Sequence, residues 1–94
     1  MIIRPEAEAD LATARSWYER QRAGLGAEFL LCMEEVVERI DRTPEMYRMV
    51  YHDVRRALTR RFPYAVYYRI AGQAVVILGI LHMRRDPHEW QSRV

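Results

Sequence analysis

The chain has 94 residues, which allow one domain spanning residues 1–94 and leave no room for a second hydrophobic core. Half of the residues are hydrophobic and 30% are charged, a balance that excludes a disordered segment and is typical of a globular protein. The single cysteine excludes an internal disulfide and a multi-cysteine metal site, and no apolar run is long enough to cross a bilayer. We therefore expect a cytoplasmic protein that does not act at a membrane.

Charge is distributed unevenly along the chain. Residues 1–45 carry six Arg and ten Asp or Glu, a net charge of −4, whereas residues 46–94 carry nine Arg and three Asp or Glu, a net charge of +6. A basic half indicates an acidic partner, and both nucleic acid and an acidic protein segment fit that description. Composition alone does not choose between them.

The first elements predicted along the chain are a strand and a helix. Residues 1–4 are mostly apolar and β-branched, which predicts a short strand. Pro5 suits the first position of a helix, and acidic residues follow in the turns where the helix dipole favours negative charge. This helix is expected to end near Ala23. Its apolar residues recur at helical spacing and predict one buried stripe, made of Ala7, Leu11, Ala14, Trp17 and Tyr18.

A second helix is predicted after Gly24-Leu25-Gly26, where glycine supplies the positive φ angles that reverse the chain. Thr43-Pro44 ends it, because proline has no backbone N–H and its ring clashes with the preceding turn. The two helices should therefore form an amphipathic hairpin. The stripe expected to be buried on the second helix is made of Phe29, Met33, Val36, Val37 and Ile40.

Three strand-length runs follow Pro44, at residues 54–61, 64–71 and 74–81. The connections between them are only two residues long, which makes neighbouring runs antiparallel. The predicted fold class is therefore α+β, in the order β-α-α-β-β-β. We expect a two-helix hairpin packed on a small, mainly antiparallel sheet.

The last of these runs, residues 74–81, has no polar residue on either face, so it should be covered on both sides. The helix hairpin provides one cover. The remaining residues 82–94 are mostly polar, and we do not expect them to provide the other. The sequence therefore predicts that a partner docks on the second face.

Basic and aromatic residues are interleaved in the second half of the chain. Guanidinium groups neutralise phosphates and tyrosine rings stack on bases, so the pattern suits RNA. The alternative is structural, with tyrosines packed in the sheet and arginines keeping the strands hydrated. A nuclease would need a proton acceptor and a cation, for which His82 and Arg84 or Arg85 are candidates, although His82 also suits a structural role. No metal site, Cys–His nucleophile or glycine-rich phosphate loop is recognisable, and we expect no cofactor.

An ordered set of short strings spans nearly the whole chain. They are Asp10-Leu11, Trp17-Tyr18, Gly24-Leu25-Gly26 with Phe29, Pro44, Arg55-Arg56-Ala57, Arg61-Phe62-Pro63-Tyr64 with Val66-Tyr67-Tyr68, and His82-Met83-Arg84-Arg85-Asp86-Pro87 with Trp90. Together these strings resemble the ParE branch of the ParE/RelE superfamily, the toxins of type II toxin–antitoxin (plasmid stabilisation) modules. The resemblance implies a cytoplasmic toxin neutralised by a ParD-like antitoxin, whose acidic, partly disordered tail folds on it.

The superfamily contains two activities. RelE-like members are ribosome-dependent mRNA endonucleases, whereas ParE-like members block DNA gyrase and are not nucleases. The chain departs from the nuclease pattern, because it has Tyr64-Ala65-Val66-Tyr67-Tyr68 where those enzymes often place an arginine, and it has no lysine. The resemblance therefore favours a gyrase inhibitor that is not an enzyme.

Two alternatives accompany this interpretation. One is a degenerate, non-toxic homologue that only binds its antitoxin. The other is the endonuclease, for which the candidate catalytic residues are Arg60 or Arg61, Tyr67, His82, Arg84 and Arg85. For the favoured interpretation, the residues expected to contact the antitoxin are Arg55, Arg56, Arg61, Tyr67, Arg69, Arg84 and Arg85.

Overall fold

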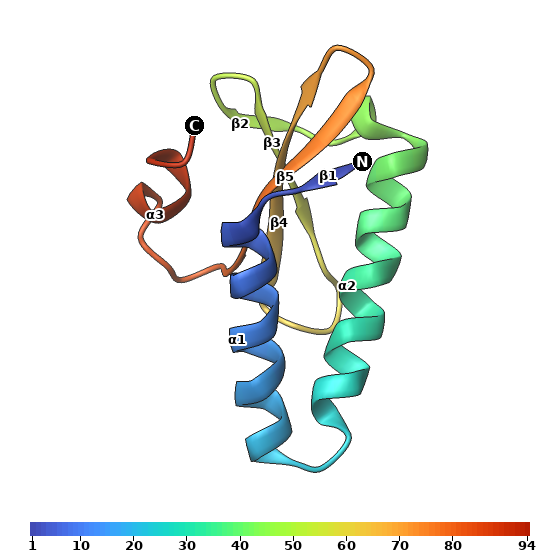
Figure 1. The fold of residues 1–94 in the computed structure, drawn as a ribbon, viewed down its shortest axis with the longest axis vertical. Coiled ribbons are helices and arrows are strands. Elements are labelled where there is room, and N and C mark those ends of the chain that lie inside the picture. Colours follow the sequence, from blue (N-terminus) through green and yellow to red (C-terminus); the bar gives the residue numbers. More distant parts are fainter.

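A computed structural model describes the whole of residues 1–94 (Figure 1). Its elements in chain order are β1 (Ile2–Ile3), α1 (Pro5–Gln21), α2 (Leu25–Arg42), the 3-10 helix η1 (Pro44–Met46), β2 (Met49–Tyr51), β3 (Val54–Leu58), β4 (Tyr64–Ala71), β5 (Ala74–His82) and α3 (His88–Gln91). The five strands form one sheet in the order β1-β5-β4-β3-β2, in which β1 is parallel to β5 and the other neighbours are antiparallel. The predicted α+β fold, a helix hairpin on a mainly antiparallel sheet, is confirmed.

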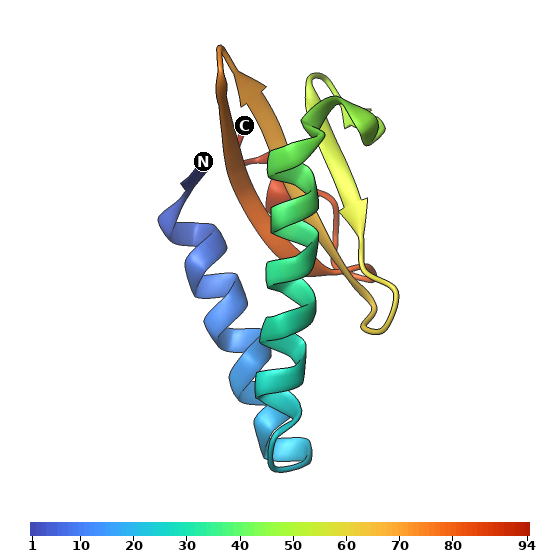
Figure 2. The same ribbon diagram turned by 90° about the vertical axis from the view of Figure 1, so that its right-hand side faces the viewer.

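A carboxylate holds the turn of the helix hairpin, which projects beyond the sheet (Figure 2). Gly24 has φ +89°, so the chain reverses at a position that favours glycine. The backbone N–H groups of Gly24 and Gly26 donate to the Glu19 carboxylate at 2.9 and 3.0 Å, and these bonds lower the pKa of Glu19. A Cβ on Gly26 would lie 2.8 Å from the Arg15 carbonyl oxygen. Close approach of the two helices therefore requires glycine at this position.

The main core lies between the helix hairpin and the sheet. Four residues of the stripe predicted on α2 are buried there, each at most 2% exposed: Phe29, Met33, Val36 and Ile40. Tyr68 of β4 is fully buried in the same core, and its hydroxyl donates to the Pro44 carbonyl oxygen. Burial raises the pKa of Tyr68 to about 12, so the hydroxyl stays protonated and ties η1 to the sheet.

Three local predictions differ from the structure. Trp17 was expected in the buried stripe but is 49% exposed, and its ring packs edge-on against Tyr18 at 5.0 Å. The strand predicted over residues 54–61 ends at Leu58, because the Thr59 hydroxyl donates to the Phe62 carbonyl oxygen and starts a turn. The three-residue strand β2 was not predicted, since it is too short to show a period.

The second face of the sheet is covered by the chain itself, so the prediction of an uncovered face was wrong. Trp90 of α3 is 5% exposed, and its ring stacks on Tyr67 of β4 with 4.3 Å between centroids. The other buried members of this cluster are Val54, Ala65, Leu78 and Leu81. A single indole buries enough apolar surface to close the face, while the polar residues around it remain hydrated. We call residues 86–94 the C-terminal strap.

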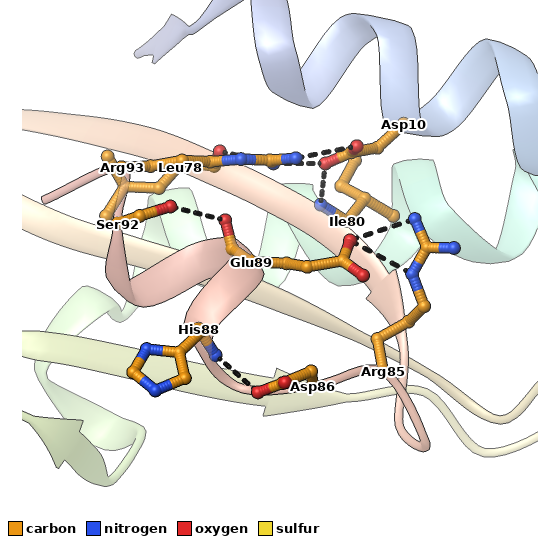
Figure 3. A network of polar contacts seen from close by, with 9 residues as sticks. All are labelled: Asp10, Leu78, Ile80, Arg85, Asp86, His88, Glu89, Ser92 and Arg93. Carbon is orange, nitrogen blue, oxygen red and sulfur yellow. Dashed lines mark hydrogen bonds and ion pairs between the residues drawn. The ribbon is translucent and has the colours of Figure 1, made fainter.

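An ion pair anchors the end of the strap at the edge of β5 (Figure 3). The Arg93 guanidinium contacts the Asp10 carboxylate at 2.6 and 3.2 Å and also donates to the Leu78 carbonyl oxygen at 3.2 Å. Asp10 in turn accepts the Ile80 backbone N–H at 3.0 Å. These side chains satisfy the backbone of β5 beyond the point where β1 ends. A Cβ on Gly79 would lie 2.8 Å from Nη1 of Arg93, so a side chain there would displace the guanidinium from this position.

Candidate functional site

An apolar groove of about 640 Å³ lies between α1, α2 and the β1–β5 edge. Its walls come from four elements, and its apolar lining consists of Met1, Ile3, Leu11, Leu30, Met33, Val37, Ile77 and Ile80. Leu30 and Val37 are seven residues apart on α2, beside the stripe that faces the core. The apolar arc of α2 is therefore wider than its own core requires. We call this hollow the apolar groove.

Acidic side chains form the rim of the apolar groove. Three belong to α2 and one to α1: Glu34, Glu38, Asp41 and Glu8. Of these four residues, only Glu38 has an ion pair, with Arg42 at 3.6 Å across exposed side chains. An apolar floor with an anionic rim is suited to a segment that combines apolar side chains with Lys or Arg. An acidic segment would be repelled at this place.

The sheet has an open edge beside the groove. β1 is the terminal strand, and it pairs with β5 over only two residues. Met1, Ile2 and Ile3 are 46%, 54% and 39% exposed. An exposed apolar edge strand offers unpaired backbone groups to an added strand. The groove and this edge together provide a continuous apolar surface that the chain leaves uncovered.

The seven predicted antitoxin contacts do not form one cluster. Tyr67 is 4% exposed beneath Trp90, and the Arg55 guanidinium donates to the carbonyl oxygens of Glu45 and Tyr47 at 3.0 and 2.7 Å. Arg55 therefore tethers the segment around η1. Arg56 and Arg84 have no ion pair.

The other three predicted contacts each have a carboxylate partner. Arg61 pairs with Glu28 of α2 at 2.9 Å, Arg69 with Asp53 at 3.1 Å, and Arg85 with Glu89 at 3.0 Å. All three arginine side chains remain at least 38% exposed, although Nε of Arg69 is buried without a partner. Such exposed pairs contribute little to stability, so an incoming carboxylate can exchange with the existing one at small cost.

The candidate nuclease residues are divided by the sheet. Tyr67 packs in the cluster under the C-terminal strap, whereas His82 lies beside Tyr64, whose ring contacts the main core. Residues three apart on a strand point to opposite faces, so Tyr67 and Tyr64 cannot face the same ligand. Tyr64, which sequence reasoning did not single out, is the tyrosine next to His82, with 5.4 Å between ring centroids. The β-hairpin register, in which Tyr64 is opposite His82, could have identified it.

The structure has neither a cluster of metal ligands nor a membrane-spanning helix. No group of three His, Cys, Asp or Glu residues is placed to hold a metal ion. None of the helices combines the length and the apolar composition that crossing a membrane requires.

Comparison with known proteins gives two findings. The family model described as "ParE toxin of type II toxin-antitoxin system, parDE" matches residues 1–87. A solved structure described as "Chromosomal ParDE TA system from P. aeruginosa" superposes with a TM-score of 0.63 at 20% sequence identity, over 87% of this chain and 95% of that chain. This likeness shows a shared fold. Comparison with curated proteins finds no match.

Proposed function

The chain belongs to the ParE toxin family of type II toxin–antitoxin systems, and on that premise we propose that it is a toxin neutralised by a ParD-like antitoxin bound across the apolar groove. The observation that carries this proposal is an apolar surface left uncovered along the groove and the β1 edge. Contiguous exposed apolar surface of this kind marks interaction sites in small proteins.

The proposed antitoxin segment in the groove is amphipathic. Its apolar side chains pack on Leu30 and Val37, and Lys or Arg side chains beside them pair with Glu34, Glu38 and Asp41. This assignment departs from the expectation of an acidic, partly disordered tail, because the segment in the groove carries Lys or Arg. An acidic part of the antitoxin would instead follow the arginines outside the groove.

Among the arginines predicted to contact the antitoxin, Arg56 and Arg84 are available to new partners, because neither has an ion pair or a side-chain hydrogen bond. Arg56 lines a hollow at the β2 edge, where Met46 and Leu58 are 64% and 44% exposed. This hollow suits a carboxylate flanked by apolar side chains. Tyr67 is a contact only if the C-terminal strap moves away from the sheet.

A pair of neighbouring leucines tests the groove. Leu30 lines the groove, whereas Leu31 is 62% exposed and does not line it. Leu30→Ala should weaken antitoxin binding about tenfold or more, because an apolar anchor at an interface centre is lost. Leu31→Ala should leave the affinity within about twofold. The measurement is calorimetric titration of each purified chain with the antitoxin of the same module.

The opposite pattern would contradict the groove assignment. If Leu31→Ala weakens the complex as much as Leu30→Ala does, or if neither has an effect, the antitoxin binds elsewhere. Circular dichroism of the free variants checks that both keep the wild-type fold.

We propose DNA gyrase as the target, on the basis of the ParE family and not of any contact described above. Of the two proton-handling candidates of the endonuclease alternative, Tyr67 is buried under Trp90, so that alternative depends on His82. The non-toxic alternative predicts that expression of the chain alone leaves growth unchanged. A fall in gyrase supercoiling caused by the purified chain distinguishes the proposed target from both alternatives.

A further inference from the structure

A second hollow lies between α1 and the adjoining ends of β4 and β5, on the other side of Ile80 from the apolar groove. It consists of an outer part of about 520 Å³ and an inner part of about 140 Å³. The two parts share five lining residues: Thr13, Ala14, Tyr64, His82 and Arg85. The outer part adds Trp17, Tyr18 and Pro63, and the inner part reaches Asp10. We call this hollow the α1–β5 cleft.

An aromatic wall borders the outer part of the cleft. Trp17 is 49% exposed, and its indole is supported by the ring of Tyr18 at 5.0 Å in an edge-on contact. Tyr18 is itself stacked on the buried Phe29 at 5.0 Å, so the support is rigid. An exposed indole held in this way offers its face to a planar ring, which is how proteins bind unpaired bases.

Hydrogen-bond donors also line the cleft, at Tyr64, His82 and Arg85. The Arg84 backbone N–H donates to Nδ1 of His82 at 3.0 Å, so in the neutral imidazole the proton is on Nε2, which is free to donate. The Arg85 guanidinium is held by Glu89 through Nε at 3.1 Å and Nη2 at 3.0 Å, and Nη1 has no partner (Figure 3). Burial raises the pKa of the Tyr64 hydroxyl, which therefore remains a donor at neutral pH.

The negative charge of the inner part is already neutralised. Asp10 is held by Arg93 at 2.6 Å and accepts the Ile80 N–H, so its carboxylate has little capacity to bind a cation or repel an anion. A cleft lined by an aromatic wall and three donors suits a ligand that carries a planar ring and an anionic group. The volume lies in the range of small-ligand sites.

We propose that the α1–β5 cleft binds a 5′-phosphorylated nucleoside, with the base against Trp17 and the phosphate at Nη1 of Arg85 and Nε2 of His82. The outer part receives the base, and the donors at the shared wall receive the phosphate. This binding site goes beyond the proposed antitoxin and gyrase functions and does not depend on either.

Tryptophan fluorescence of the full chain tests the proposal, because Trp17 is exposed and Trp90 is buried. AMP should quench the emission saturably, and Trp17→Phe should remove the response. Adenosine should bind about tenfold more weakly, since the phosphate contacts are missing, and inorganic phosphate alone should not quench. A chain that shows no saturable quenching with AMP would overturn the proposal.

Neighbouring arginines provide the matched control. Arg85→Gln should weaken AMP binding about tenfold, whereas Arg84→Gln, which alters a residue outside the cleft, should not. His82→Gln keeps an N–H donor near the Nε2 position and should retain more affinity than His82→Leu. Equal losses in Arg84→Gln and Arg85→Gln would indicate unspecific charge attraction and would also overturn the proposal.

A 5′-phosphorylated trinucleotide distinguishes two ligands of the same chemistry, a free mononucleotide and the 5′ end of a nucleic-acid strand. Affinity about tenfold above that of AMP assigns the cleft to the end of a nucleic-acid strand, because further phosphates add charge contacts. Equal affinity assigns it to a free mononucleotide. Either result supports the site. No binding of either compound rejects it.

Discussion

Trp90→Ala should lower the free energy of unfolding by about 3–5 kcal/mol, the usual cost of removing a buried tryptophan. Trp90 is 5% exposed and its indole is stacked on Tyr67, while the Tyr51 ring packs edge-on against it with 5.7 Å between centroids. Its loss leaves the apolar cluster of the second sheet face open to water. Because small domains are stable by only about 5–15 kcal/mol, the change removes a large share of the total. Urea unfolding monitored by circular dichroism measures it.

The other tryptophan supplies the control for this experiment. Trp17→Ala should cost less than about 1 kcal/mol, because the side chain is 49% exposed. Trp90→Phe keeps a ring on Tyr67 and should retain more stability than Trp90→Ala, which covers the case in which the alanine variant does not fold. Equal losses for Trp17→Ala and Trp90→Ala would show that the strap does not cover the sheet in solution.

Asp10→Ala should cost about 3–5 kcal/mol, because it leaves the Arg93 guanidinium and the Ile80 N–H without their partner. The pair is well shielded, with side chains 10% exposed for Asp10 and 18% for Arg93. In the double variant Asp10→Ala/Arg93→Met, no unpaired charge remains, and the loss should be smaller than the sum of the two single losses. Chemical denaturation of the four chains gives the coupling energy.

A surface pair on α2 serves as the comparison. Glu38→Ala removes the exposed pair with Arg42 and should cost at most about 1 kcal/mol. If Asp10→Ala costs no more than Glu38→Ala, or if the double variant shows no coupling, the ion pair does not anchor the strap.

The helix hairpin and the three-stranded meander could be predicted because their signals are local. Helical spacing identified Phe29, Met33 and Ile40 as buried, and the glycines before Phe29 marked the reversal. The alternation on β4 separated Tyr67 from its neighbours correctly. The alternation could not predict which residue covers Tyr67, because that residue, Trp90, lies more than twenty positions later in the sequence.

The two tryptophans show why the remaining predictions failed. Trp17 lies at the margin of an apolar stripe, and its exposure depends on how α1 is rotated against the sheet. Trp90 is flanked by polar residues in the sequence, so the composition of this segment gave no sign that its side chain closes the second face. The uncovered apolar surface is therefore on the groove side, where Leu30 and Val37 extend the α2 stripe. A wide apolar arc on a surface helix was the available signal.

A gyrase supercoiling assay with the antitoxin titrated in tests the central claim most directly. The purified chain should reduce the supercoils that gyrase introduces into relaxed plasmid with ATP, and the antitoxin should restore them. The Leu30→Ala chain should need about tenfold more free antitoxin than wild type for restoration, because the antitoxin loses an apolar contact in the groove. Unchanged supercoiling at concentrations above those that arrest growth, with new 5′ ends inside the codons of translated mRNA, would contradict the account and favour a RelE-like nuclease.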